Sequence, residues 1–180
     1  MENILPRNRL SKPSSFFFST KIHNKAVSPD LELELYNGSN KLYFEKFNRE
    51  WVEKYFEVEP IDELYFKNPK ELIIDKGGEV FFVKHKGEYI GTCAMLKKGN
   101  SYELAKMGVT ESSRGLGAGQ FLMDVAIEWA HEQGAEKVFL ITNSQLGPAN
   151  SLYLKNGFVI THQGPHPDYK RADRIFEKAL

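Results

Sequence analysis

Hydrophobic and polar positions follow two different periods along the chain, and together they predict a mixture of strands and helices. Leu and Glu alternate over residues 31–36, which is the period of a half-buried strand. Apolar side chains recur at helical spacing over residues 39–56 and 119–134, and Gly134 is a typical helix-ending residue. Shorter helices are predicted at 59–66, 68–74 and 148–157, and further strands at 80–84, 89–97, 101–109, 137–142, 158–163 and 174–180.

The order of these elements favours one α/β domain over residues 31–180. Strands and helices are interspersed, which is typical of a mixed sheet with helices on both faces. The continuous apolar run at 137–142 predicts a fully buried strand. Residues 1–30 are different, since they carry five Lys and Arg side chains, two acidic ones, three prolines and a serine cluster. We expect a flexible N-terminal extension there, with an organelle transit peptide as the alternative.

The overall charge gives no sign of a polyanionic partner. The chain has 24 basic and 24 acidic residues, so we expect neither nucleic acid nor a membrane surface as a partner. The only cysteine, Cys93, lies in an apolar strand pattern and is expected to be a small core residue. The five histidines are scattered without metal-ligand spacing, so no metal site is predicted. The expected location is the cytoplasm.

A glycine-rich stretch, RGLGAG at residues 114–119, lies directly before the long helical pattern at 119–134. Glycines let backbone N–H groups approach a ligand, and at a helix N-terminus such groups suit an anion. The plain alternative is a tight turn between a strand and a helix. A Walker loop is excluded because Gln120 and Phe121 follow Gly119, and a dinucleotide fingerprint fails because position 120 is not glycine.

The remaining match is the pattern [R/Q]-x-x-G-x-[G/A], and it is accompanied by two further motifs. The strand ELAKMGV (103–109) precedes the loop, and LYLKNGF (152–158) follows the next strand in a short helix. In this order and spacing the chain resembles the GNAT-type N-acetyltransferase superfamily over residues 31–180. The resemblance implies a mostly antiparallel, splayed sheet of six or seven strands, with acetyl-CoA as co-substrate and no metal.

The resemblance also implies which residues hold the co-substrate. The loop backbone would hold the pyrophosphate with an added contact from Arg114, and the preceding strand would pair with the pantetheine arm. Asn143 directly follows the strand at 137–142 and either contacts the cofactor or caps the next helix. The implied cofactor-binding residues are Met107, Gly108, Val109, Arg114, Gly115, Leu116, Gly117, Ala118, Gly119 and Asn143.

Two residues match catalytic positions of the superfamily. Glu103 would accept the amine proton, directly or through water, and Tyr153 would protonate the departing sulfur. The alternatives are a solvated strand Glu, with water or another acid as the base, and a core aromatic. A strand period of two places residues 103, 105, 107 and 109 on one face. Near the C-terminus, Tyr169 and Arg171 lie in a segment that resembles one bordering the acceptor site in relatives.

The leading function is therefore acetyl transfer from acetyl-CoA to a primary amine on a small molecule or peptide. A non-catalytic acyl-CoA sensor would keep the fold and the loop without turnover. A nucleotide-binding module is disfavoured by the failed fingerprints. A homodimer is left open as an alternative to a monomer.

Overall fold

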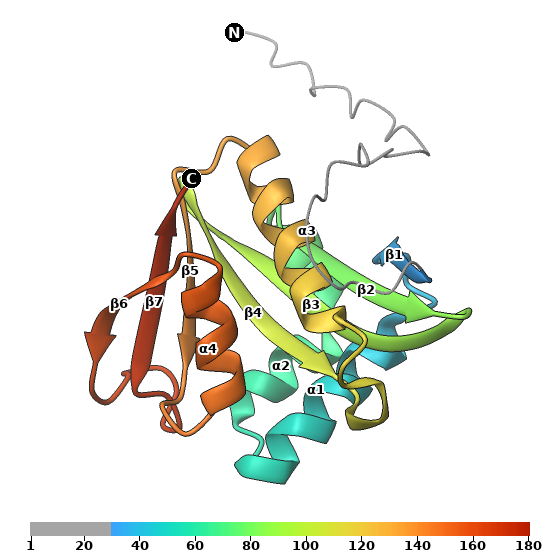
Figure 1. Cartoon of the computed structure of the whole chain (residues 1–180), viewed down its shortest axis with the longest axis horizontal. Coiled ribbons are helices and arrows are strands. Elements are labelled where there is room, and N and C mark those ends of the chain that lie inside the picture. Colours follow the sequence, from blue (N-terminus) through green and yellow to red (C-terminus); the bar gives the residue numbers. More distant parts are fainter. Residues whose placement is uncertain (1–29) are drawn as a thin grey trace, which may run out of the picture.

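The computed structural model describes residues 30–180, so the predicted N-terminal extension and its transit-peptide alternative lie outside the described residues except for Asp30. The described part forms a seven-stranded sheet with helices on both faces, as the sequence predicts (Figure 1). The strands are β1 (Leu31–Leu35), β2 (Glu79–His85), β3 (Glu88–Lys98), β4 (Ser101–Val109), β5 (Lys137–Thr142), β6 (Val159–Gln163) and β7 (Arg174–Ala179).

The sheet has the order β1-β2-β3-β4-β5-β7-β6 and is mostly antiparallel. Only the β4–β5 pair is parallel, and the other five neighbouring pairs are antiparallel. The single parallel pair lies at the centre of the sheet, and α3 makes the crossover that it requires. This confirms a mixed, mostly antiparallel sheet.

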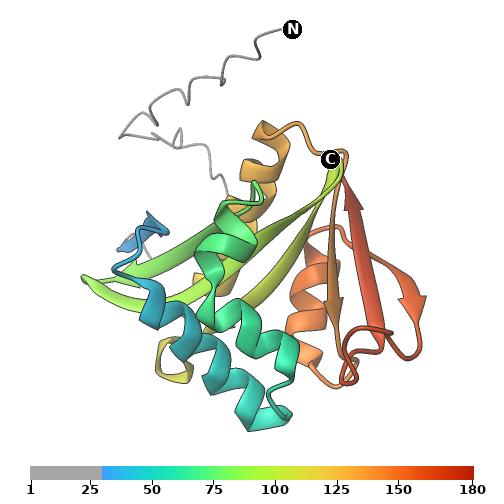
Figure 2. The ribbon, with the colours of Figure 1, turned by 180° about the vertical axis from the view of Figure 1, so that it is seen from behind.

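Four α-helices cover the two faces of the sheet. Helices α1 (Lys41–Tyr55) and α2 (Pro60–Lys67) lie on one face, and α3 (Ala118–Glu132) and α4 (Gly147–Lys155) on the other (Figures 1 and 2). Each face buries its own apolar cluster, with Phe44, Phe66 and Phe82 on the α1 side and Leu122 and Phe176 on the α3 side. The short helix predicted at 68–74 is a single π-helical turn, Lys70–Ile74.

The prediction that β5 is fully buried is wrong. Val138, Leu140 and Thr142 are buried, whereas the residues between them are only half-buried. Helices α3 and α4 cover the first face of β5, but α1 packs against β3 and β4 and leaves the second face of β5 partly open. The half-open face of β5 becomes one wall of the cleft described next.

Candidate active site: a cleft where two strands part

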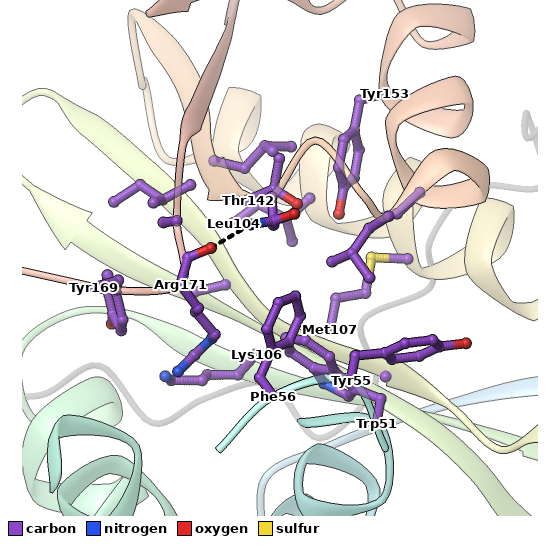
Figure 3. Close-up of a pocket in the computed structure, with 18 of the residues that line it drawn as sticks. Trp51, Tyr55, Phe56, Leu104, Lys106, Met107, Thr142, Tyr153, Tyr169 and Arg171 are labelled. Carbon is purple, nitrogen blue, oxygen red and sulfur yellow. Dashed lines mark hydrogen bonds between the residues drawn. The ribbon is translucent and has the colours of Figure 1, made fainter. Parts of the chain in front are cut away.

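Strands β4 and β5 part in the middle of the sheet. They pair over only three residue pairs, from Ser101↔Lys137 to Glu103↔Phe139, and then diverge. A cleft of about 450 Å³ opens between them, with α1 on one side and the β6–β7 loop on the other (Figure 3). Beyond Glu103, the edge of β4 facing β5 makes no described strand pairing, so its backbone groups are open to a ligand.

A β-bulge in β4 shapes the wall of this cleft. Lys106 and Met107 together oppose the single Cys93 of β3, and Lys106 has a left-handed φ of 53°. The extra residue turns the strand over: Ala105 packs in the α1-side cluster, but Met107 and Val109 pack in the α3-side cluster. The predicted common face of residues 103, 105, 107 and 109 is therefore wrong, because a simple period of two does not survive a bulge.

The glycine-rich loop lies at the mouth of the cleft. Gly115 and Gly117 have φ values of 87° and 79°, which non-glycine residues rarely adopt, and Gly117 directly precedes α3. Within the described chain no side chain caps α3, so its first N–H groups and its positive dipole end are available to an anion. Arg114 lines the cleft beside the loop and forms an ion pair with Glu111 at 3.0 Å.

Glu103 lines the cleft where the two strands begin to part and is only 6% exposed. Burial raises the pKa of its carboxyl above the usual range, and the positive charges of Lys98 and Lys106 offset only part of that effect. The Lys98 Nζ lies 3.9 Å from Glu103 Oε2, too far for a hydrogen bond. Glu103 is thus a carboxylate with raised basicity whose ion pair with Lys98 is long and carries no hydrogen bond.

Tyr153 lies on α4 and directs its hydroxyl into the same cleft (Figure 3). Its ring packs edge-on against Phe158 and Phe176, with ring centroids 6.3 and 5.5 Å away. Burial raises the pKa of Tyr153 to about 12, opposed by a side-chain hydrogen bond with Thr142. The phenol therefore remains protonated throughout the neutral range.

Asn143, Tyr169 and Arg171 also line the cleft, but their side chains have protein partners. The predicted residues of the glycine-rich loop beyond Arg114 do not line it, and Ala118 is buried in the α3-side core. The Asn143 amide donates to the carbonyl of Arg171 and its oxygen accepts from the Gln145 N–H, so it ties the β5–α4 loop to the β6–β7 loop. The Arg171 guanidinium is held by two carboxylates, and the Tyr169 ring lies 5.3 Å from it. The structure thus brings all the predicted catalytic and acceptor-site residues to one cleft.

Four further residues shape the site without having been predicted. They are Trp51, Asp62, Lys106 and Thr142. The position of Lys106 inside an apolar strand was the one sequence signal that could have pointed to it. Trp51 gave no such signal, because it fits the helical spacing of a core residue. Trp51 closes over the cleft because Gly108 lets α1 approach: a Cβ at 108 would lie 2.8 Å from Trp51 Cδ1.

The described residues contain no group of three or more His, Cys, Asp and Glu side chains arranged to hold a metal ion. No helix in this part of the chain is both long and apolar enough to cross a membrane.

Comparison with known proteins identifies the family. The sequence model described as the acetyltransferase (GNAT) family matches residues 40–158, which contain β4, the glycine-rich loop, α3 and α4. The chain belongs to the GNAT acetyltransferase family. No curated protein matches the chain at a significant level.

Solved acetyltransferase structures share the fold at low sequence identity. An acetyltransferase of the GNAT family from Staphylococcus aureus has a TM-score of 0.76 and 23% identity, covering 83% of this chain and 99% of that one. An acetyltransferase from Streptococcus agalactiae has a TM-score of 0.73 and 17% identity, covering 84% and 99%. The PaiA N-acetyltransferase of Thermoplasma acidophilum, solved in complex with coenzyme A, has a TM-score of 0.64 and 18% identity, covering 83% and 99%.

Proposed function

We propose that the protein is an N-acetyltransferase that moves an acetyl group from acetyl-CoA to a primary amine by direct attack. The observation that carries this proposal is the parting of β4 and β5 beside the uncapped N-terminus of α3. An anionic pyrophosphate suits the free N–H groups of the helix, and an extended arm suits the open edge of β4. Coenzyme A combines both features in one ligand, and the similar Thermoplasma protein was solved with coenzyme A.

The side chains of the cleft supply the proton transfers. Acetyl-CoA, when bound, supplies the activated acetyl group, whose bond to sulfur breaks as the amine nitrogen forms the new amide bond. Glu103 accepts the proton that the attacking nitrogen loses, directly or through a water, and its raised basicity suits this role. Tyr153 donates its proton to the departing sulfur, so that coenzyme A leaves as a neutral thiol. Because Glu103 gains a proton and Tyr153 loses one, solvent resets both groups after turnover.

The co-substrate contacts are proposed for this chain's own residues. The backbone of Met107–Val109 would face the pantetheine arm, and the backbone of Gly115–Gly119 would face the phosphates, with Arg114 beside them. Asn143 lines the opposite wall and shapes it through its bond to Arg171.

The test is incubation of the purified protein with acetyl-CoA and a panel of primary amines. Release of free thiol and an acetylated product of matching mass are expected with at least one amine, and Glu103→Gln serves as the matched control. Acetyl-CoA binding without thiol release for any amine would instead identify the protein as a non-catalytic acyl-CoA sensor. Failure to bind acetyl-CoA would remove both functions.

A further inference from the structure

The acceptor side of the cleft contains an unusual cluster of buried and half-buried charges, which we call the Asp62 cluster: Glu59, Asp62, Lys106 and Arg171. Asp62 is completely buried, and its carboxylate accepts from Lys106 Nζ at 2.6 Å and from Arg171 Nη1 and Nη2 at 2.6 and 2.9 Å. Glu59 Oε1 accepts from the same Arg171 Nη1 at 3.1 Å. Two cations that line the cleft are thus each held by a carboxylate of α2 or its N-cap.

This arrangement decides which charges remain for an acceptor. Arg114, the third cation lining the cleft, forms its ion pair with Glu111 at the cofactor end. These three cations have carboxylate partners within 3.1 Å, whereas the ion-pair partner of Glu103, Lys98 Nζ, is 3.9 Å away. The cleft therefore offers the Glu103 carboxylate to one amino group of an acceptor. A carboxylate on the acceptor would instead have to compete with Asp62 and Glu59 for Lys106 and Arg171, whose charges are already neutralised.

The other walls of the acceptor side are apolar rings. Trp51 and Phe56 from the end of α1 and Tyr169 from the β6–β7 loop surround the opening (Figure 3). The Trp51 and Phe56 rings meet edge-on, with their centroids 6.5 Å apart. Rings of this kind bury a flat apolar group well, and their faces also attract a cation.

We propose that the acceptor is a primary amine carried on an aromatic or otherwise apolar body with no carboxylate beside the amine. This inference rests on the proposed acetyltransferase function and names its substrate class. The free amine nitrogen lies beside Glu103, which accepts the one proton that the nitrogen loses on attack, and the body packs against Trp51, Phe56 and Tyr169. The Asp62 cluster acts as a specificity device, because it neutralises the cations that would otherwise bind an amino-acid carboxylate.

A neighbouring groove contains cations that could bind an acceptor carboxylate. This groove of about 650 Å³ shares Phe56, Asn143 and Arg171 with the cleft and is also lined by Lys170 and Arg174. The Arg174 side chain reaches toward α4, where Nη1 lies 3.5 Å from Asn150 Oδ1 and Nε is buried. An acceptor carboxylate that used a cation outside the Asp62 cluster would have to reach Lys170 or Arg174 in this groove.

The experiment compares phenethylamine, phenylalaninamide, phenylalanine and spermidine as acceptors with acetyl-CoA. Phenylalaninamide matches phenylalanine in size but lacks its negative charge, and spermidine adds cations that Glu103 alone does not neutralise. Rates are referred to the free-base concentration of each amine, because only the free amine attacks. We expect kcat/KM for phenethylamine and phenylalaninamide to exceed that for phenylalanine and spermidine by at least about tenfold, a difference of about 1.4 kcal/mol.

A ratio of phenylalaninamide to phenylalanine below tenfold overturns the inference, as does preferred use of spermidine. Either result leaves the acetyltransferase function standing, because an amine has then been acetylated. Thiol release with none of the four amines but with a different amine also overturns the inference alone. If none of the amines tested, including those outside this set of four, leads to thiol release, the proposed function and the inference both fail.

A variant tests whether the Asp62 cluster causes the preference. Asp62→Asn keeps the size of the side chain and removes one of the charges that neutralise Lys106 and Arg171, so the phenylalaninamide-to-phenylalanine ratio should fall at least about threefold. Glu63→Gln is the matched control: it makes the same charge change on α2, but Glu63 pairs with Arg49 instead. If Asp62→Asn does not fold, Glu59→Gln at the partly exposed end of the cluster replaces it, with a fall in the same direction. A ratio equal to that of the parent in the folded variant refutes the role of the cluster.

Discussion

Replacing Asp62 by alanine should destabilise the protein more than any other single change in the cleft. The Asp62 carboxylate accepts four hydrogen bonds, three from the cationic groups of Lys106 and Arg171 and one from the Glu59 backbone N–H at 3.1 Å. Burial opposes ionisation of Asp62, but these bonds and the nearby positive charges lower its carboxyl pKa below the usual range. Removal leaves Lys106, whose side chain is 5% exposed, without its counter-charge.

Breaking a buried ion pair from one side costs about 3–5 kcal/mol, so urea unfolding at pH 7 should show a loss of that size for Asp62→Ala. Lys106→Met should cost less than about 1.5 kcal/mol, because Asp62 keeps its two bonds to Arg171 and methionine fits among the surrounding rings. In the Lys106→Met background, Asp62→Ala should cost at least about 1 kcal/mol less than in the parent. Equal costs in both backgrounds, with unchanged m-values, would refute the idea that the two charges stabilise each other.

Three substitutions test the proposed chemistry. Glu103→Gln should lower kcat/KM about 10²–10⁴-fold at neutral pH, with a smaller loss at high pH where the free amine is abundant; an unchanged pH profile would assign the base to water or another acid. The same change should raise the thermal midpoint of unfolding at neutral pH, because a raised pKa means that the ionised Glu103 carboxylate destabilises the folded state. This gain should disappear as the pH falls below the ordinary Glu pKa of 4.5, where the carboxyl is protonated in both the folded and the unfolded state. Tyr153→Phe should lower kcat while the Kd for acetyl-CoA holds and stability falls by no more than about 1 kcal/mol, whereas a core-aromatic role predicts full activity. Gly117→Val should weaken acetyl-CoA binding, since a φ of 79° strains valine at the start of α3; calorimetry showing parental affinity would exclude the loop as the binding site.

The parts of the fold that local patterns determine could be predicted from the sequence. The strands and long helices follow from apolar periodicity, and the glycine-rich loop was identifiable because glycine is required at positive φ. Glu103 and Tyr153 were found through their place in the motifs, and both line the cleft. Whether they act as base and acid remains a prediction.

The parts that depend on distant contacts could not be predicted. Asp62 is separated by 44 residues from Lys106 and by 109 residues from Arg171, so no local pattern joins them. The bulge at Lys106 was also hidden, because its sequence continues the strand pattern while its backbone adopts a left-handed φ. The buried ion pair with Asp62 holds the Lys106 side chain at this bulge, and that contact exists only after α2 has packed on the sheet.

The parting of β4 and β5 also bears on how the protein avoids aggregation. An unpaired strand edge is a template for strands of other molecules, and proteins normally protect such edges at the rim of a sheet. Here two open edges face each other in the interior of the sheet, with Trp51 on one side and α4 on the other. A slender extended ligand can enter between them, but a strand that brings its own sheet is too broad. The protein therefore keeps unpaired backbone N–H and C=O groups available to a ligand while preventing strands of other protein molecules from pairing with them.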